Sequence, residues 1–437
     1  MKQQSFLYST GYLAIASGVT LIIWMTGLES IGIPIFLVFL FLLFLLSRDI
    51  MPAIPLLMNA LFMVSQTEWS MELIPLYIYL VPVALVGGIV AHIIRFRVNI
   101  FKGKMTMGIG IMFLAMLLST INAEHVDINY LFYALIGLTY AFVYFYFVNS
   151  LEGNHTDYLI RMMVILGFLI VSQVLVYYLR VDDVILALEQ KTITLGWGIS
   201  NYVATYLIMF IPMAFYYARK QKINFPWILL IVIEIMALFF TLSRGGIVAF
   251  LATLPFLIVY LFKTNTWKSS LISFIGVIAV MGLIIIIFKD LFLAIFDRFA
   301  VLLLDDTGRI EIYIDAWETF KEKPLFGAGI FARVDEFGNF RMFHNTILHV
   351  MACFGLVGLV GLVIQVIMMF RIILTRINEK TVILGIAVLG AHIHGMVDNV
   401  YLMPQFMILF FLIIAVMENA NKQIANDSIL LRAEGAS

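Results

Sequence analysis

Residues 346–370 read TILHVMACFGLVGLVGLVIQVIMMF and contain no Asp, Glu, Lys or Arg. This run is longer than the about 20 apolar residues that a helix needs to cross the hydrocarbon core of a membrane. Apolar segments of near-spanning length recur along the whole chain, separated by short polar loops. A segment inside a bilayer must satisfy its own backbone hydrogen bonds, and the period-two alternation of a membrane strand is absent. The stretch therefore predicts one membrane helix among many.

The composition of the chain agrees with this fold class. Of its 437 residues, 63% are hydrophobic and only 12% are charged. A water-soluble fold would have to expose more apolar surface than such folds tolerate. The 27 basic and 27 acidic residues balance, which argues against nucleic acid as a partner. The single cysteine, Cys353, excludes an internal disulfide and a cysteine metal site.

We predict an all-α, polytopic membrane bundle of about 14 transmembrane helices. Their expected cores are residues 12–25, 34–46, 52–64, 73–94, 105–120, 130–148, 158–179, 202–218, 226–242, 247–262, 271–288, 346–370, 382–395 and 401–417. The first apolar segment is expected to be retained rather than removed as a signal peptide. The expected regions are 1–200 (N-terminal helices), 201–288 (helices with a Ser-Arg-Gly-Gly motif), 289–343 (an external loop) and 344–437 (C-terminal helices and a cytoplasmic tail).

The distribution of Lys and Arg predicts the orientation, because cytoplasmic loops carry an excess of them. With the N-terminus inside, the basic clusters at 95–104, 219–222 and 371–380 are all cytoplasmic. Acidic residues such as Glu29 and Asp182 are then external. Both termini are therefore expected in the cytoplasm, and the long loop 289–343 outside.

The long loop is expected to contain an amphipathic helix. Asp305 or Thr307 is predicted to cap a helix that runs through Lys321, with one apolar stripe along it. Such a helix lies on the membrane surface or on the bundle. Loops of this length are usually functional.

Arg244 is a candidate anion-binding residue. It lies in residues 241–246 (TLSRGG), between two apolar helices, and paired glycines there allow backbone and ligand to approach closely. The alternative is an interfacial arginine that reaches to lipid headgroups. Glu234, ten residues earlier, lies in the middle of an apolar span and has no catalytic role that we can assign.

Arg309 and His344 are the other candidates, at the two ends of the long loop. Arg309 is expected to bind an anion, or else to form a surface salt bridge with Asp305, Asp306 or Asp315. His344 lies where the loop re-enters the membrane. Its neighbour Asn345 either holds the imidazole or caps the next helix. With Arg244, these residues offer two guanidinium forks for a diphosphate and one titratable base.

Several short motifs occur in a fixed order around these residues. They are 198–201 (GISN), 243–246 (SRGG), Arg309 with Trp317, 324–329 (PLFGAG), 344–345 (HN) and 355–359 (GLVGL). The ordered set resembles the O-antigen ligase and O-antigen polymerase superfamily of bacterial membrane glycosyltransferases. The resemblance covers residues 201–404, whereas the first half matches only as a series of helices.

The resemblance implies a GT-C-like membrane bundle and a set of site residues. Arg244, Arg309 and His344 are expected to bind the donor diphosphate and assist glycosyl transfer without a metal or cofactor. Asn201, Asn345 and Asp398 are expected to contact substrate. Asp398 would orient the acceptor, and the alternative for Asp398 is helix capping. His344 acts either as a general base or as a phosphate ligand.

The resemblance also implies partners and a location. The expected partners are a polyprenyl diphosphate-linked oligosaccharide, an acceptor glycan, membrane lipid, and flippase and chain-length regulator proteins. The expected location is the bacterial cytoplasmic (inner) membrane, with the active site on the external face. Direct displacement at the sugar would invert the anomeric centre.

Three activities are compatible with these residues. The favoured one is a polymerase that joins lipid-linked repeat units of O-antigen, capsule or exopolysaccharide, because no distinctive acceptor-docking domain is visible. The first alternative is a ligase that transfers the glycan to a lipid core, a protein or a wall polymer. The second is a transporter or flippase, which would place charges along a path through the membrane.

Overall fold

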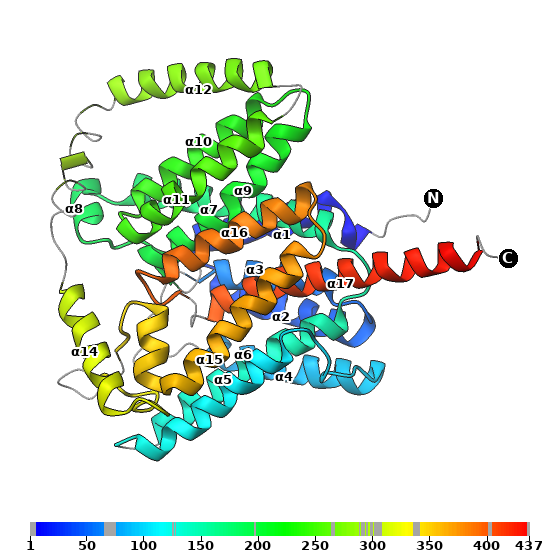
Figure 1. The fold of residues 1–437 in the computed structure, drawn as a ribbon. Coiled ribbons are helices and arrows are strands. Elements are labelled where there is room, and N and C mark those ends of the chain that lie inside the picture. The colour runs from blue at the N-terminus through cyan, green and yellow to red at the C-terminus, as the bar shows by residue number, and fades with distance from the viewer. Residues whose placement is uncertain are drawn as a thin grey trace. The chain divides into compact units, whose positions relative to one another are not determined.

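The computed structural model describes residues 6–64, 76–124, 126, 128–195, 198–263, 267–287, 289, 293, 296–297, 300, 308–334, 341–400 and 404–434. Over these residues the chain is helical except for loops and one small hairpin (Figure 1). Among them, six helices are long and apolar enough to cross a membrane. The chain is thus an all-α polytopic membrane protein, as predicted. Each predicted core overlaps a helix, while the number of spans stays a prediction.

The chain divides into two compact units. Unit 1 comprises residues 1–97, 157–305 and 382–391, and unit 2 comprises 98–156, 306–381 and 392–437. Unit 1 contains η1 (Phe6–Tyr8), α1 (Thr10–Thr26), α2 (Glu29–Leu46), η2 (Met51–Ala53), α3 (Ile54–Phe62), α4 (Leu76–Phe96), α7 (Thr156–Arg180), α8 (Val184–Glu189), β1 (Thr194–Leu195), β2 (Gly198–Ile199), α9 (Ser200–Lys220), α10 (Phe225–Phe240), α11 (Arg244–Phe262) and α12 (Trp267–Ile287). Unit 2 contains α5 (Thr106–Ser119), η4 (Thr120–Asn122), α6 (Ile128–Ser150), α14 (Arg309–Glu322), α15 (Thr346–Leu374) and α17 (Pro404–Glu434). Helix α16 (Glu379–Gly395) contributes residues to both units.

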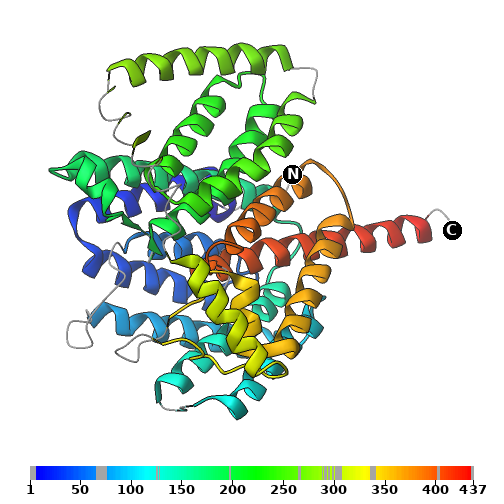
Figure 2. The same cartoon turned by 60° about the vertical axis from the view of Figure 1, so that its left-hand side comes forward.

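Unit 1 is built around α9, whose residues are almost all buried. It packs against α10 and α11, and both views show these helices beside one another (Figure 2). The short antiparallel hairpin of β1 and β2 pairs Thr194 with Ile199 immediately before α9. The sequence did not predict this hairpin, because strands of two residues are too short for a period-two pattern.

Unit 2 contains a close pair of helices, α5 and α15. A Cβ atom added to Gly361 would lie 2.9 Å from the backbone nitrogen of Met112, and one added to Gly108 would lie 2.8 Å from that of Gln365. Any side chain at either position would push the helices apart. Glycines that allow such approach are typical of helix pairs in membranes.

Helix α15 is broken at Gly355, although its apolar run predicts one continuous helix. Gly355 has φ 63° and ψ −158°, which is not helical. The segment 324–329 fills the break: the backbone N–H groups of Ala328 and Gly329 donate to the carbonyls of residues 352 and 353, at 2.8 and 3.0 Å. In return Leu356 N–H donates to the carbonyl of residue 324 at 2.8 Å. These bonds replace the helical hydrogen bonds that the break removes.

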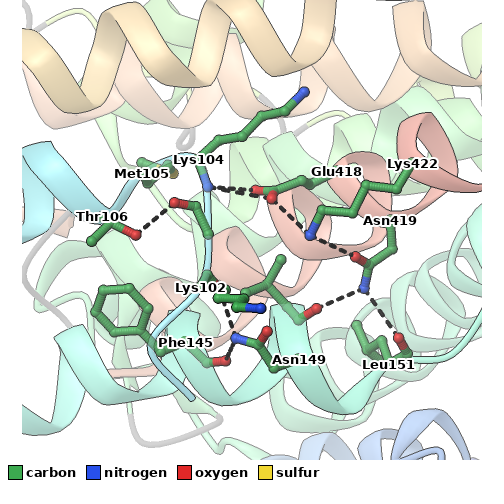
Figure 3. A network of polar contacts seen from close by, with 12 residues as sticks. Lys102, Lys104, Met105, Thr106, Phe145, Asn149, Leu151, Glu418, Asn419 and Lys422 are labelled. Atoms are coloured by element: carbon green, nitrogen blue, oxygen red, sulfur yellow. Dashed lines mark hydrogen bonds and ion pairs between the residues drawn. The ribbon is translucent and has the colours of Figure 1, made fainter. Parts of the chain in front are cut away.

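A buried carboxylate joins the middle of α17 to its neighbours in unit 2 (Figure 3). Glu418 is 1% exposed and accepts hydrogen bonds from the backbone N–H of Lys104 and, at 2.7 Å, from the Tyr144 hydroxyl. Lys422 Nζ lies 2.9 Å from its other oxygen. Next to it, the Asn419 amide donates to carbonyls at the end of α6, as Figure 3 shows. Glu418 therefore ties α17 to α6 and to the loop before α5.

We expect the Glu418→Ala variant to be less stable than the wild type. The Tyr144 hydroxyl and the Lys104 N–H would lose their acceptor, and each unsatisfied buried donor costs about 1–3 kcal/mol. The measurement is thermal unfolding of the purified protein in detergent, followed by tryptophan fluorescence. The control is Glu322→Ala, since Glu322 is exposed at the end of α14. Equal transition temperatures for the two variants would show that the contacts of Glu418 do not stabilise the fold.

Candidate functional site

Asp398 lies at the centre of a cluster in unit 2, in the loop between α16 and α17. It is buried, and its Oδ1 atom lies 3.2 Å from Nδ1 of His344. Its Oδ2 atom lies 3.9 Å from Nη2 of Arg309. The backbone N–H of Asn399 also donates to Oδ1, at 2.9 Å. One carboxylate thus holds two residues that lie far apart in the sequence.

Arg309 is the first residue of α14, and its side chain reaches the loop after α16. Nη1 donates to the carbonyl oxygen of Val397 at 2.7 Å, while 26% of the side chain remains exposed. The expected alternative partner Asp315 instead lies 3.6 Å from Nε of Arg333. Because Arg309 is fixed by its hydrogen bond to Val397 and is still partly exposed, its guanidinium can bind an anion without a prior change of conformation.

The predicted cap of this helix was wrong. The N-cap residue of α14 is Gly308, with φ 70° and no capping side chain, and the helix ends at Glu322. A glycine is suited to this position because the left-handed backbone there strains residues with a Cβ atom. The predicted caps Asp305 and Thr307, and the Asp306 alternative for pairing, lie outside the described residues.

His344 presents its imidazole to Asp398 from an unusual backbone conformation. Its φ is 49°, in the left-handed region that residues with a Cβ atom rarely adopt. An ionised carboxylate only accepts hydrogen bonds, so Nδ1 of His344 carries the proton when it bonds Asp398. The other ring nitrogen, Nε2, is then the basic one. The side chain is 40% exposed, which suits a group that exchanges a proton with substrate.

Burial and charge act in opposite directions on Asp398. Burial alone would raise the pKa of its carboxyl, but the hydrogen bond from His344 and the charges of His394, His344 and Arg309 outweigh burial. The pKa of Asp398 is therefore lowered from its ordinary value of 3.8, and the group is ionised at neutral pH. An ionised Asp398 favours the tautomer of His344 described above.

Asn345 caps the helix that follows His344. Its Oδ1 atom accepts the backbone N–H of Leu348 at 3.0 Å, and its Nδ2 donates to the carbonyl of Met396 at 2.7 Å. The sequence left open whether Asn345 holds the imidazole of His344 or caps the next helix. These contacts favour capping. The second bond also ties the start of α15 to the loop that carries Asp398.

Arg244 and Asn201 belong to unit 1, at the starts of α11 and α9. Ser243 caps α11, since its Oγ accepts the N–H of Gly246 at 3.2 Å. A Cβ atom on Gly246 would lie only 2.7 Å from that of Ala204, one turn after Asn201. The two helix starts that carry Arg244 and Asn201 therefore lie close together.

The structure thus describes two groups of predicted site residues. Arg309, His344, Asn345 and Asp398 lie together in unit 2, and Arg244 and Asn201 in unit 1. Among the described residues, no cluster of three or more His, Cys, Asp or Glu side chains could hold a metal ion. Sequence reasoning missed Tyr313, whose hydroxyl contacts His344. The only signal for it was its position one turn after Arg309.

The fold and this cluster define a class of protein: a polytopic helical membrane protein in which a buried aspartate holds an arginine and a histidine. Residues 228–363 match the family model described as O-antigen ligase. A comparison with curated proteins gave no match. The match includes Arg244, Arg309 and His344 and supports the superfamily indicated by the motifs. The chain is accordingly a helical membrane protein in which residues 228–363 are similar to the O-antigen ligase family.

Proposed function

We propose that the protein transfers a glycan from a polyprenyl diphosphate carrier to a sugar hydroxyl of another lipid-linked repeat unit, on the outer face of the bacterial cytoplasmic membrane. The observation that carries the proposal is that Asp398 holds both Arg309 and the imidazole of His344. The cluster offers a cation for a leaving diphosphate and an oriented base for an attacking hydroxyl.

The proposed step is a direct displacement. Nε2 of His344 takes the proton of the acceptor hydroxyl as its oxygen bonds to the anomeric carbon. The bond between that carbon and the diphosphate oxygen breaks, and its electron pair leaves with the polyprenyl diphosphate. Arg309 neutralises the charge that develops on the diphosphate, and Arg244 is proposed as a further anion-binding residue. Asp398 stabilises the imidazolium that forms, and the anomeric centre inverts.

Asp398 has a different role in this proposal from the one expected of it. Acceptor binding would require a carboxylate open to substrate, but Asp398 is buried and bound by His344, Arg309 and Asn399. We therefore propose that it positions His344 and Arg309. Asn201 and Asn345 remain proposed substrate contacts, and for Asn345 the contacts above show a capping function as well.

Incubation with a lipid-linked repeat unit as the only substrate tests the activity. A polymerase yields a ladder of products and releases polyprenyl diphosphate, whereas a ligase requires a separate acceptor and a flippase releases none. Arg244→Ala, Arg309→Ala and His344→Ala are each expected to lower turnover by roughly 10²- to 10³-fold. The control is Lys321→Ala, whose side chain lies on the exposed face of α14. Full turnover by all three site variants would contradict the proposal.

A further inference from the structure

Helix α14 brings two side chains to the cluster, not one. Arg309 and Tyr313 are four residues apart, so they lie on the same face of the helix, one turn from each other. Arg309 donates to the carbonyl of Val397, and the Tyr313 hydroxyl donates to the carbonyl of His344 at 3.1 Å. The same helix therefore contacts both loop segments that form the cluster.

His344 is held at two points. Asp398 binds its ring, and Tyr313 binds its backbone carbonyl. The backbone at His344 has φ 49°, which a residue with a Cβ atom adopts only when its surroundings impose it. A hydrogen bond to the carbonyl of that same residue is well placed to impose it. Without this bond, rotation of the backbone would swing the imidazole away from Asp398.

The Tyr313 hydroxyl is suited to remain a donor. Burial raises its pKa, the charge of Asp398 acts in the same direction, and the charge of Arg309 opposes them. The hydroxyl therefore keeps its proton at the pH values at which a membrane enzyme works. A phenylalanine at this position would keep the ring and its packing and remove only the hydrogen bond.

We propose that Tyr313 is a positioning residue, which holds the backbone of His344 so that the imidazole faces Asp398 and Nε2 faces the acceptor. The inference rests on the proposed function of His344 as the base. Helix α14 would then have two functions. It carries Arg309, which binds the anion, and through Tyr313 it orients His344, the base.

Activity of the Tyr313→Phe variant is the first test. We expect kcat to fall about five- to tenfold, as for the loss of one hydrogen bond, with KM for the lipid-linked repeat unit unchanged. In a His344→Ala background the same substitution should cause no further loss, because Tyr313 acts only through His344. The control is Glu311→Gln, since Glu311 is exposed and lies two residues from each of Arg309 and Tyr313, on the opposite side of α14.

Chemical modification of His344 is a second test that needs no activity. We expect diethyl pyrocarbonate to modify His344 severalfold faster in the Tyr313→Phe variant than in the wild type or in Glu311→Gln, as measured by peptide mass spectrometry. Unchanged kcat with unchanged modification, or an equal loss in the His344→Ala background, would overturn the inference. Faster modification of His344 together with full turnover of His344→Ala would leave the positioning contact intact and reject the proposed function instead.

Discussion

Asp398→Asn is expected to lower turnover by roughly 10²- to 10⁴-fold, the range associated with an oriented general base. The asparagine carries no charge, so it cannot stabilise the imidazolium of His344. Its amide group would also present N–H donors to Arg309 or His344, which are themselves donors. The measurement is the steady-state rate of ladder formation with lipid-linked repeat units, at several substrate concentrations.

The same experiment separates positioning from acceptor binding. If Asp398 positions His344 and Arg309, kcat falls and KM for the acceptor is nearly unchanged, whereas an acceptor-binding residue would raise this KM. The control is Asp315→Asn, because 55% of the Asp315 side chain is exposed and its partner Arg333 lies 3.6 Å away. A large rise in KM for the acceptor with an unchanged kcat would refute the positioning role.

Gly355→Ala is expected to destabilise the fold by more than about 3 kcal/mol, from left-handed backbone strain and steric clash together. The φ of Gly355 is 63°, and an added Cβ atom would lie 2.5 Å from the carbonyl group of Leu325. Segment 324–329 would then have to leave the break in α15. Gly327→Ala should behave alike, because its added Cβ would overlap the backbone of Cys353.

The yield of monodisperse protein in size-exclusion chromatography, with the unfolding temperature, measures this effect. Gly110→Ala is the matched control, because Gly110 lies within α5 and nothing lies within 4 Å of an added Cβ atom there. We expect the control to be neutral or slightly more stable. If Gly355→Ala folded as well as Gly110→Ala, the docking of segment 324–329 would not be needed for the fold.

The loop helix illustrates how far the sequence predicts the site. The period of its apolar residues predicted a helix, and the structure has one at Arg309–Glu322. Its first residue, Arg309, was predicted correctly, but its cap was not, because a capping side chain was expected at Asp305 or Thr307 and the N-cap is the left-handed Gly308. Arg309, at its start, was predicted as a site residue from its residue type and its motif alone. Its partner on the loop after α16 could not be inferred, since the two lie 88 residues apart.

The break in α15 could not be predicted for a similar reason. Apolar composition predicts that residues 346–370 lie in a membrane, but it does not require the helix to be continuous. The break depends on donors and acceptors supplied by segment 324–329, which is distant in sequence. The glycines in both segments were visible, but neither shows by itself which backbone it meets.

The sequence alone determined that this protein is a helical membrane protein, because apolar length and the need to satisfy backbone groups in a bilayer leave few other solutions. It also determined which cations and which histidine to suspect. Only the tertiary structure decided that Asp398 is shared by Arg309 and His344, and that Tyr313 holds the backbone of His344. Such contacts join residues that are distant along the chain, and the pattern of neighbouring residues in the sequence therefore cannot predict them.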